Sequence, residues 1–219
     1  MPINKKYLVD FSPENFFHVY NRTNNYELLF RGPHNKTHFL NLAEERLSYL
    51  LDFYSWCLLP NHFHFQVKTK SVESALDHLS KIASTKLTLT EARFLNGERS
   101  FEELTLRAWT AVFQAYTEGF NNMYKRKGNL FYSSCKRVLI ESEAQFRNSM
   151  VYIHTNPVKH GLIEDFRQYE WSSWNQYMSQ GRTIIPKEET YKIFGNRQGF
   201  LMAHEIQQQF INEKDLWML

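Results

Sequence analysis

Two short stretches of the chain hold residues whose types and spacing could do chemistry. His62 and His64 lie two residues apart in a segment that alternates polar and apolar side chains. Alternate residues of a β-strand point to the same face, so the two imidazoles could grip one cation. Ninety residues later, Tyr152 and Asn156 lie four residues apart, and on a helix they would share one face.

Together these residues predict a metal-assisted tyrosine nucleophile that cuts single-stranded DNA. Zinc is the usual metal for imidazole ligands alone, but a carboxamide oxygen from Asn156 would favour Mg²⁺ or Mn²⁺. A tyrosine nucleophile must also lose its phenolic proton. The metal, a bound water, His154 or Lys159 could accept it, and the sequence does not choose between them.

The remaining pattern predicts the elements that must position these side chains. We expect strands over residues 16–22, 28–30, 53–59, 62–68 and 130–140. We expect helices over residues 39–50, 72–83 and 109–123, a helix that opens at a Ser142–Gln145 capping box and is limited by Pro157, and a helical tail over 187–219. Residues 93–102 are expected to form a polar connection. Strands alternating with helices favour an α+β fold, with helices over a small antiparallel sheet.

Composition restricts the class of protein only loosely. The 219 residues are 42% hydrophobic, which is enough for one or two domains with a real core. The net charge of +3 permits a polyanionic partner without requiring one. Cys57 and Cys135 are expected to be buried free thiols. The chain shows no signal core and no apolar run of membrane-spanning length, so we expect a cytoplasmic protein, nucleoid-associated when bound to DNA.

Basic residues cluster where they could follow a DNA backbone. The candidate DNA contacts are Arg22, Arg31, Lys125, Arg126, Lys127, Lys136 and Arg137. A solvated helix end would explain the run 125–127 equally well. Tyr26 and Tyr132 are aromatic side chains that could stack on unpaired bases.

Four ordered motifs give the chain a family resemblance. They are residues 17–22, 59–64, 152–158 and 171–174. In this order and at these separations they resemble the one-tyrosine HUH transposases of the insertion-sequence-200-like group, and most of all the REP-associated tyrosine transposase branch. The chain lacks the Gly-Thr-x-Tyr element that this branch often carries, and Ser133–Ser134 stand where relatives often place a Gln-x-Arg element.

The resemblance implies a fold, a site and a reaction. The fold would be the HUH palm, a ferredoxin-like or RRM-like antiparallel sheet with packed helices, over residues 1–175, followed by a C-terminal helical extension over 176–219. His62, His64 and Asn156 would hold Mg²⁺ or Mn²⁺, and Tyr152 would be the nucleophile. The substrate would be single-stranded DNA with hairpin structure, cleaved and rejoined through a 5′-phosphotyrosine. Members of the group include dimers and monomers, so a homodimer is possible here.

Two other classes of function fit some of these residues. A domesticated relative could bind DNA hairpins without cutting them, and it would keep binding when Tyr152 is replaced by phenylalanine. A zinc hydrolase acting on small substrates would need no DNA and would be indifferent to Tyr152.

Overall fold

A four-stranded antiparallel sheet forms the centre of the protein. The computed structural model describes residues 8–24, 27–132, 135–181 and 183–216, with the side chains of 213–216 left aside. The strand order is β2-β3-β1-β4. The strands are β1 (Phe16–Arg22), β2 (Leu51–Leu59), β3 (His62–Thr69) and β4 (Lys136–Ile140). This sheet with its packed helices confirms the predicted α+β class.

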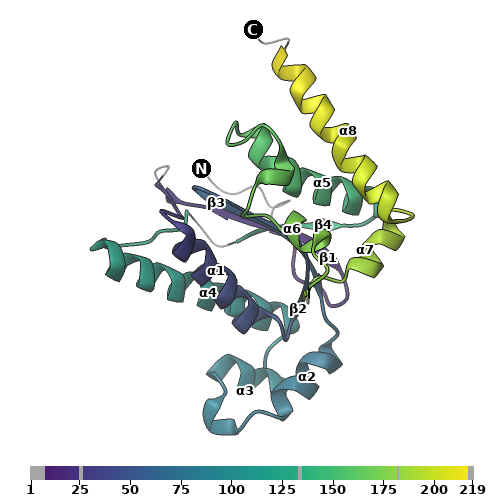
Figure 1. The fold of residues 1–219 in the computed structure, drawn as a ribbon. Coiled ribbons are helices and arrows are strands. Elements are labelled where there is room, and N and C mark those ends of the chain that lie inside the picture. The colour runs from purple at the N-terminus through teal and green to yellow at the C-terminus, as the bar shows by residue number, and fades with distance from the viewer. Residues whose placement is uncertain (1–7, 25–26, 133–134, 182, 217–219) are drawn as a thin grey trace.

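Helices cover both faces of the sheet (Figure 1). On one face α1 (Pro33–Leu47) packs against α4 (Phe101–Tyr124), and on the other face α5 (Glu143–Lys159) contacts β2, β3 and β4. The other helices are α2 (Val72–Ser80), α3 (Leu89–Leu95), α6 (Trp174–Met178), α7 (Lys187–Ile193) and α8 (Arg197–Leu216), with short 3₁₀ turns η3 (Ser84–Lys86) and η4 (Phe166–Gln168).

The alternation in β3 is the sequence signal that sets this layering. Phe63, Phe65 and Val67 are fully buried in the core on the α1 and α4 side. His64 and Gln66 point to the opposite face, and they are buried as well because α5 covers it. The polar face of β3 therefore lines the interface with α5 rather than facing open solvent.

Helix α5 begins where its capping signal predicts. The Ser142 hydroxyl accepts a hydrogen bond from the backbone N–H of Gln145 at 3.2 Å. The Gln145 side chain accepts from the N–H of Glu141 instead of Ser142, so the reciprocal half of the box shifts by one residue. Pro157 stays inside the helix, which ends two residues later at Lys159, and Gly161 then reverses the chain with φ of 63°.

Three expected elements differ from the structure. Residues 28–30 form no strand, because the N–H groups of Leu29 and Phe30 both bond the carbonyl of Pro60 instead of a ladder partner. The expected connection over 93–102 overlaps α3, a helix too short for its period to show. The strand expected over 130–140 covers only 136–140, and residues 133–134 lie outside the described residues.

The C-terminal part packs back onto the sheet. Ser172 bridges to Cys57 at the edge of β2, and the Leu58 N–H donates to the carbonyl of Trp171. Helices α7 and α8 confirm the helical tail, and they share a core with α5. Cys57 and Cys135 are free and buried, as expected. Within the described residues, no helix is both long and apolar enough to cross a membrane.

A continuous series of hydrogen bonds joins α8 to α5 and β2. His204 Nδ1 must donate to the Phe200 carbonyl oxygen at 2.7 Å, so its Nε2 accepts from His154 Nδ1 at 2.8 Å. His154 Nε2 then accepts from the Ser173 hydroxyl at 2.7 Å, whose oxygen accepts from the Trp56 N–H at 2.9 Å. Both imidazoles are fully buried, and burial lowers the pKa of each, so both are neutral at neutral pH. His154 therefore cannot accept the proton of a nucleophile.

This network predicts a loss of stability in acid. Burial lowers the pKa of His204 to about 4. Burial also holds the pKa of His154 well below its usual value, and a positive charge on His204 would lower it further. In the unfolded chain both histidines take up a proton near pH ~6.5. The contribution of the two neutral imidazoles to the unfolding free energy is therefore fully present above that pH and is lost as pH falls toward 4. We expect His204→Gln to reduce the pH slope of the unfolding free energy by about 1.4 kcal/mol per pH unit in this window, measured by urea unfolding. Equal slopes in the two proteins would contradict this assignment.

Candidate functional site

His62 and His64 lie side by side on β3, as the alternation predicts. Their ring centroids are 5.2 Å apart and the ring planes are nearly perpendicular. The backbone of β3 is fixed on both sides, by β1 and by β2, so the two side chains project from a rigid surface. His64 is buried, and His62 is partly exposed.

Neighbouring side chains fix which nitrogen of each imidazole is free. His62 Nδ1 lies 2.6 Å from Asn61 Oδ1, which can only accept, so Nδ1 donates and Nε2 carries the lone pair. His64 Nδ1 bonds His18 Nε2 at 2.9 Å. His64 Nε2 is buried and has no hydrogen-bond partner among the described residues. Each histidine therefore has its Nε2 available for a ligand.

Asn156 supplies a second unpartnered polar group. Its side chain is fully buried, and neither amide atom has hydrogen-bond geometry with any described residue. The amide still lies close enough to act on the pKa of His62, in the direction that raises it. Buried amides are nearly always hydrogen-bonded, so a buried Asn whose interaction with His62 falls short of hydrogen-bond geometry is a candidate to contact a ligand.

The electrostatics keep the imidazoles neutral. Burial is the main cause that lowers the pKa of His62 to about 4, with the nearby charge of His160 acting the same way. Burial, followed by the charge of His18, holds the pKa of His64 well below its ordinary value. A neutral imidazole is the form that binds a metal, so these residues are ready for one at neutral pH.

The residues present fit a divalent cation that accepts both nitrogen and oxygen ligands. Two imidazole nitrogens and the Asn156 oxygen would hold it, and water and substrate would complete the shell. In the part of the chain that the structure describes, no group of three or more His, Cys, Asp or Glu is placed to hold a metal ion. Asn156 is therefore the candidate for a third protein ligand.

Tyr152 lies against the same histidines. Its ring meets His64 edge-on with centroids 5.6 Å apart, and Lys159 Nζ lies 4.9 Å from its centroid. Helix α5 places Tyr152 one turn before Asn156, so the structure brings together the four residues that the sequence singles out.

These side chains open into one cleft of about 670 Å³. Tyr152, His62 and His64 line it, together with Tyr20 from β1, Tyr132 from the segment before β4 and His160 at the end of α5. Among the predicted DNA contacts, Arg22 and Lys136 belong to its lining. The cleft therefore joins the candidate nucleophile, the imidazoles and two cationic side chains.

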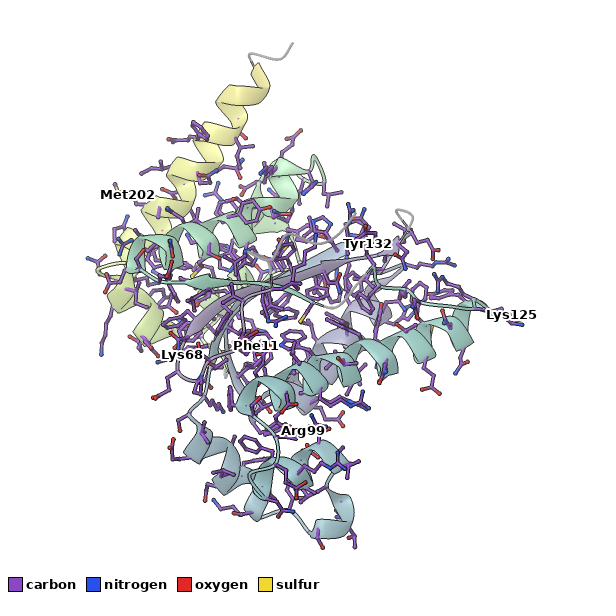
Figure 2. The ribbon with its side chains drawn as sticks, turned by 180° about the vertical axis from the view of Figure 1, so that it is seen from behind. Phe11, Lys68, Arg99, Lys125, Tyr132 and Met202 are labelled. Atoms are coloured by element: carbon purple, nitrogen blue, oxygen red, sulfur yellow. The ribbon has the colours of Figure 1, made fainter. Side chains whose placement is uncertain are left out.

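The other predicted DNA contacts are distributed unevenly. Lys125 and Lys127 are exposed beyond the end of α4. Figure 2 shows Lys125 at the outer end of that helix, on the same side of the molecule as Tyr132. Arg31 stacks on the Tyr124 ring, with 4.4 Å between its guanidinium carbon and the ring centroid. Tyr26 lies outside the described residues.

Arg126 and Arg137 have structural partners instead of open surroundings. The Arg126 guanidinium bonds both carboxylate oxygens of Glu27, at 2.6 and 3.1 Å. Arg137 is 5% exposed, and its Nη2 lies 2.7 Å from a carboxylate oxygen of Glu102. That ion pair holds β4 against the start of α4. A buried guanidinium cannot reach a DNA backbone, so we remove Arg137 from the set of contacts.

Arg137→Ala is expected to destabilise the protein by about 2–4 kcal/mol, because it leaves the partly buried Glu102 carboxylate without its partner. The exposed Lys127→Ala should change stability by less than about 0.5 kcal/mol. Urea unfolding of the two variants tests this. A near-neutral Arg137→Ala would argue against a structural ion pair.

Sequence patterns alone missed three residues of the site. His18 and Asn61 orient the two candidate ligands, and His160 faces His62 with ring centroids 5.0 Å apart. His160 could have been found, because it lies four residues after Asn156 on the same helical face. His18 could not, because its contact depends on how β1 pairs with β3.

We expect His18 to act as a positioning residue for His64. His18→Phe keeps a ring of similar size but removes the 2.9 Å hydrogen bond, so Mn²⁺ affinity should fall about 10- to 100-fold. His18→Gln, which can still hydrogen-bond, should recover part of it. Calorimetric titration with Mn²⁺ measures both, and His38→Phe on α1 is the matched control. Equal affinities for His18→Phe and wild type would exclude the role.

Comparison with known proteins finds similarity in structure but not in sequence. No family model and no curated protein matches the chain. Among solved structures, one that matches is that of a REP-associated tyrosine transposase bound to a REP hairpin. The two share 14% sequence identity and a TM-score of 0.49, over 84% of this chain and 90% of that one. The roles of individual residues are therefore argued from the contacts that their side chains make in this protein.

Proposed function

We propose that this chain is a metal-dependent transposase that cleaves and rejoins single-stranded DNA at hairpin-flanked sites. One observation carries the proposal: a half-buried tyrosine shares a cleft with two oriented, neutral imidazoles, beside a buried amide without a partner. A protein that only bound DNA would not need unpartnered buried polar atoms under its binding surface, since each of them costs stability.

The chemistry assigned to the chain is a phosphoryl transfer to Tyr152. The phenolic oxygen forms a bond to phosphorus as the bond from phosphorus to the 3′ oxygen breaks. The phenolic proton leaves Tyr152, and the departing 3′ oxygen gains a proton. The products are a 5′-phosphotyrosine and a free 3′-hydroxyl. A 3′-hydroxyl from another strand end can reverse the step and join the DNA without an energy source.

Each part of the cleft would have a distinct task. Arg22 and Lys136 would bind the phosphates that flank the scissile one. His62, His64 and Asn156 would hold Mg²⁺ or Mn²⁺, which when bound neutralises charge that develops on the phosphate oxygens. Lys159 would keep a positive charge beside the Tyr152 ring.

Trapping the covalent intermediate tests the proposal. The purified protein is incubated with hairpin oligonucleotides from the DNA around its gene, labelled at either end, with Mn²⁺ or Mg²⁺. An adduct that survives denaturation, carries the 3′ portion of the strand and disappears with chelator is expected. Tight hairpin binding without any adduct would instead indicate a binding protein that does not cut.

A further inference from the structure

A second hollow continues the cleft on the side of α4. This groove of about 790 Å³ runs between the C-terminal half of α4 and the segment 126–132. Tyr132 lines both the cleft and the groove, so one extended ligand could occupy the two together. Tyr132 is 42% exposed, and the Arg22 guanidinium carbon lies 5.0 Å from its ring centroid.

The outer wall of the groove is fixed before any ligand arrives. Besides its contact with Glu27, the Arg126 guanidinium donates to the backbone carbonyls of Lys127, Gly128 and Asn129. The Asn121 side chain donates to the Gly128 carbonyl at 2.9 Å from the end of α4. Arg126, predicted as a DNA contact, thus shapes the wall. A groove held in this way binds without first having to order a loop.

The polar groups of the groove suit a polynucleotide. Gln114, Asn122 and Asn129 present exposed carboxamides, and Lys127 presents an exposed ammonium group. Carboxamides can donate to and accept from base edges, and the ammonium can contact a phosphate. Glu118 is the carboxylate that belongs to the lining. Phe113 and Phe131 give the groove apolar area as well. A single strand can use both kinds of lining, because base faces pack on apolar side chains while base edges and phosphates meet the polar groups; an apolar peptide would leave those polar groups unpaired.

We propose that this groove binds the single-stranded DNA that leaves the catalytic cleft, with a base stacked on Tyr132 and the backbone following Lys127. The proposal rests on the proposed function, since it gives the cleaved strand its path. Stacking on an exposed aromatic ring is tolerant of sequence, whereas the carboxamides could favour particular bases beyond Tyr132.

Length-dependent binding tests the path. Strands of about five nucleotides that span only the scissile site are compared with strands extended to about twelve on one side or the other. Their affinity is measured by fluorescence anisotropy, and the adduct is measured on the same strands. We expect one extended series to bind the wild type roughly 5- to 100-fold more tightly than the short strand. Asn122→Ala with Lys127→Ala should lose most of this gain and lower the salt slope by about one.

The matched control is Asn96→Ala with Lys86→Ala, which changes the same residue types on the exposed α2–α3 side of the molecule, away from Lys125 (Figures 1 and 2). The control should keep the full gain with length. An adduct on the short strand without any gain on extension, or a gain that survives in the groove variant, would overturn the groove while leaving the proposed function intact. Absence of an adduct on the short strand, on the extended strands and on the hairpin oligonucleotides alike would instead count against the proposed function.

Discussion

Tyr152→Phe is expected to abolish the covalent protein–DNA adduct and to lower strand cleavage about 10⁴-fold or more, while hairpin binding stays within about twofold. The substitution keeps the aromatic ring against His64 and Lys159 and removes only the oxygen. Loss of the nucleophile cannot be offset by the rest of the site, because the stored ester bond is made on that atom. Gel detection of the adduct and anisotropy on the same hairpin measure the two effects.

The cleft itself provides the matched controls. Tyr20 and Tyr132 also line it, and the Tyr20 ring lies 5.7 Å from His64, almost as near as Tyr152 at 5.6 Å. Distance to the imidazoles therefore does not identify the nucleophile. The helical turn that joins Tyr152 to Asn156 favours Tyr152. Tyr20→Phe and Tyr132→Phe should keep the adduct, and mapping the modified peptide to either of them would refute our assignment.

Local periodicity accounts for the part of the site that the sequence predicts. The two-residue repeat of β3 places His62 and His64 on one face, and the four-residue spacing in α5 places Tyr152 with Asn156. Each of these relations lies within a single element. Periodicity fixes the face of a residue inside its own element, so these predictions needed no knowledge of the tertiary fold.

Contacts between distant elements explain what the sequence did not predict. Arg137 looked like a surface cation beside Lys136, but Glu102 lies 35 residues earlier and draws it into the interior. His154 looked accessible, but Ser173 and His204 enclose it from segments far along the chain. Such pairings depend on strand register and helix packing. The sequence around a polar residue does not show whether its side chain will bond a buried partner or face solvent.

The second large effect concerns the candidate metal ligands, and it should have opposite signs with and without metal. Asn156→Leu replaces a buried, unpartnered amide with an apolar group of similar size, so the metal-free protein should gain about 1–2 kcal/mol of unfolding free energy. With Mn²⁺ at about 100 times its dissociation constant, the wild type should gain about 2.7 kcal/mol, and Asn156→Leu should gain much less. Urea unfolding with Mn²⁺ and with chelator measures all four values.

His64→Ala separates this effect from simple repacking. It removes one imidazole ligand and leaves His18 Nε2 without its partner, so it should lose both metal stabilisation and cleavage, and it should also weaken the metal-free protein. The exposed His38→Ala on α1, away from the cleft, should keep the metal response. If Asn156→Leu is more stable than the wild type without metal and no longer responds to Mn²⁺, the amide binds the metal and costs the metal-free protein stability. If Asn156→Leu were destabilised without metal and responded normally to Mn²⁺, Asn156 would be a structural residue and the third ligand would have to come from elsewhere.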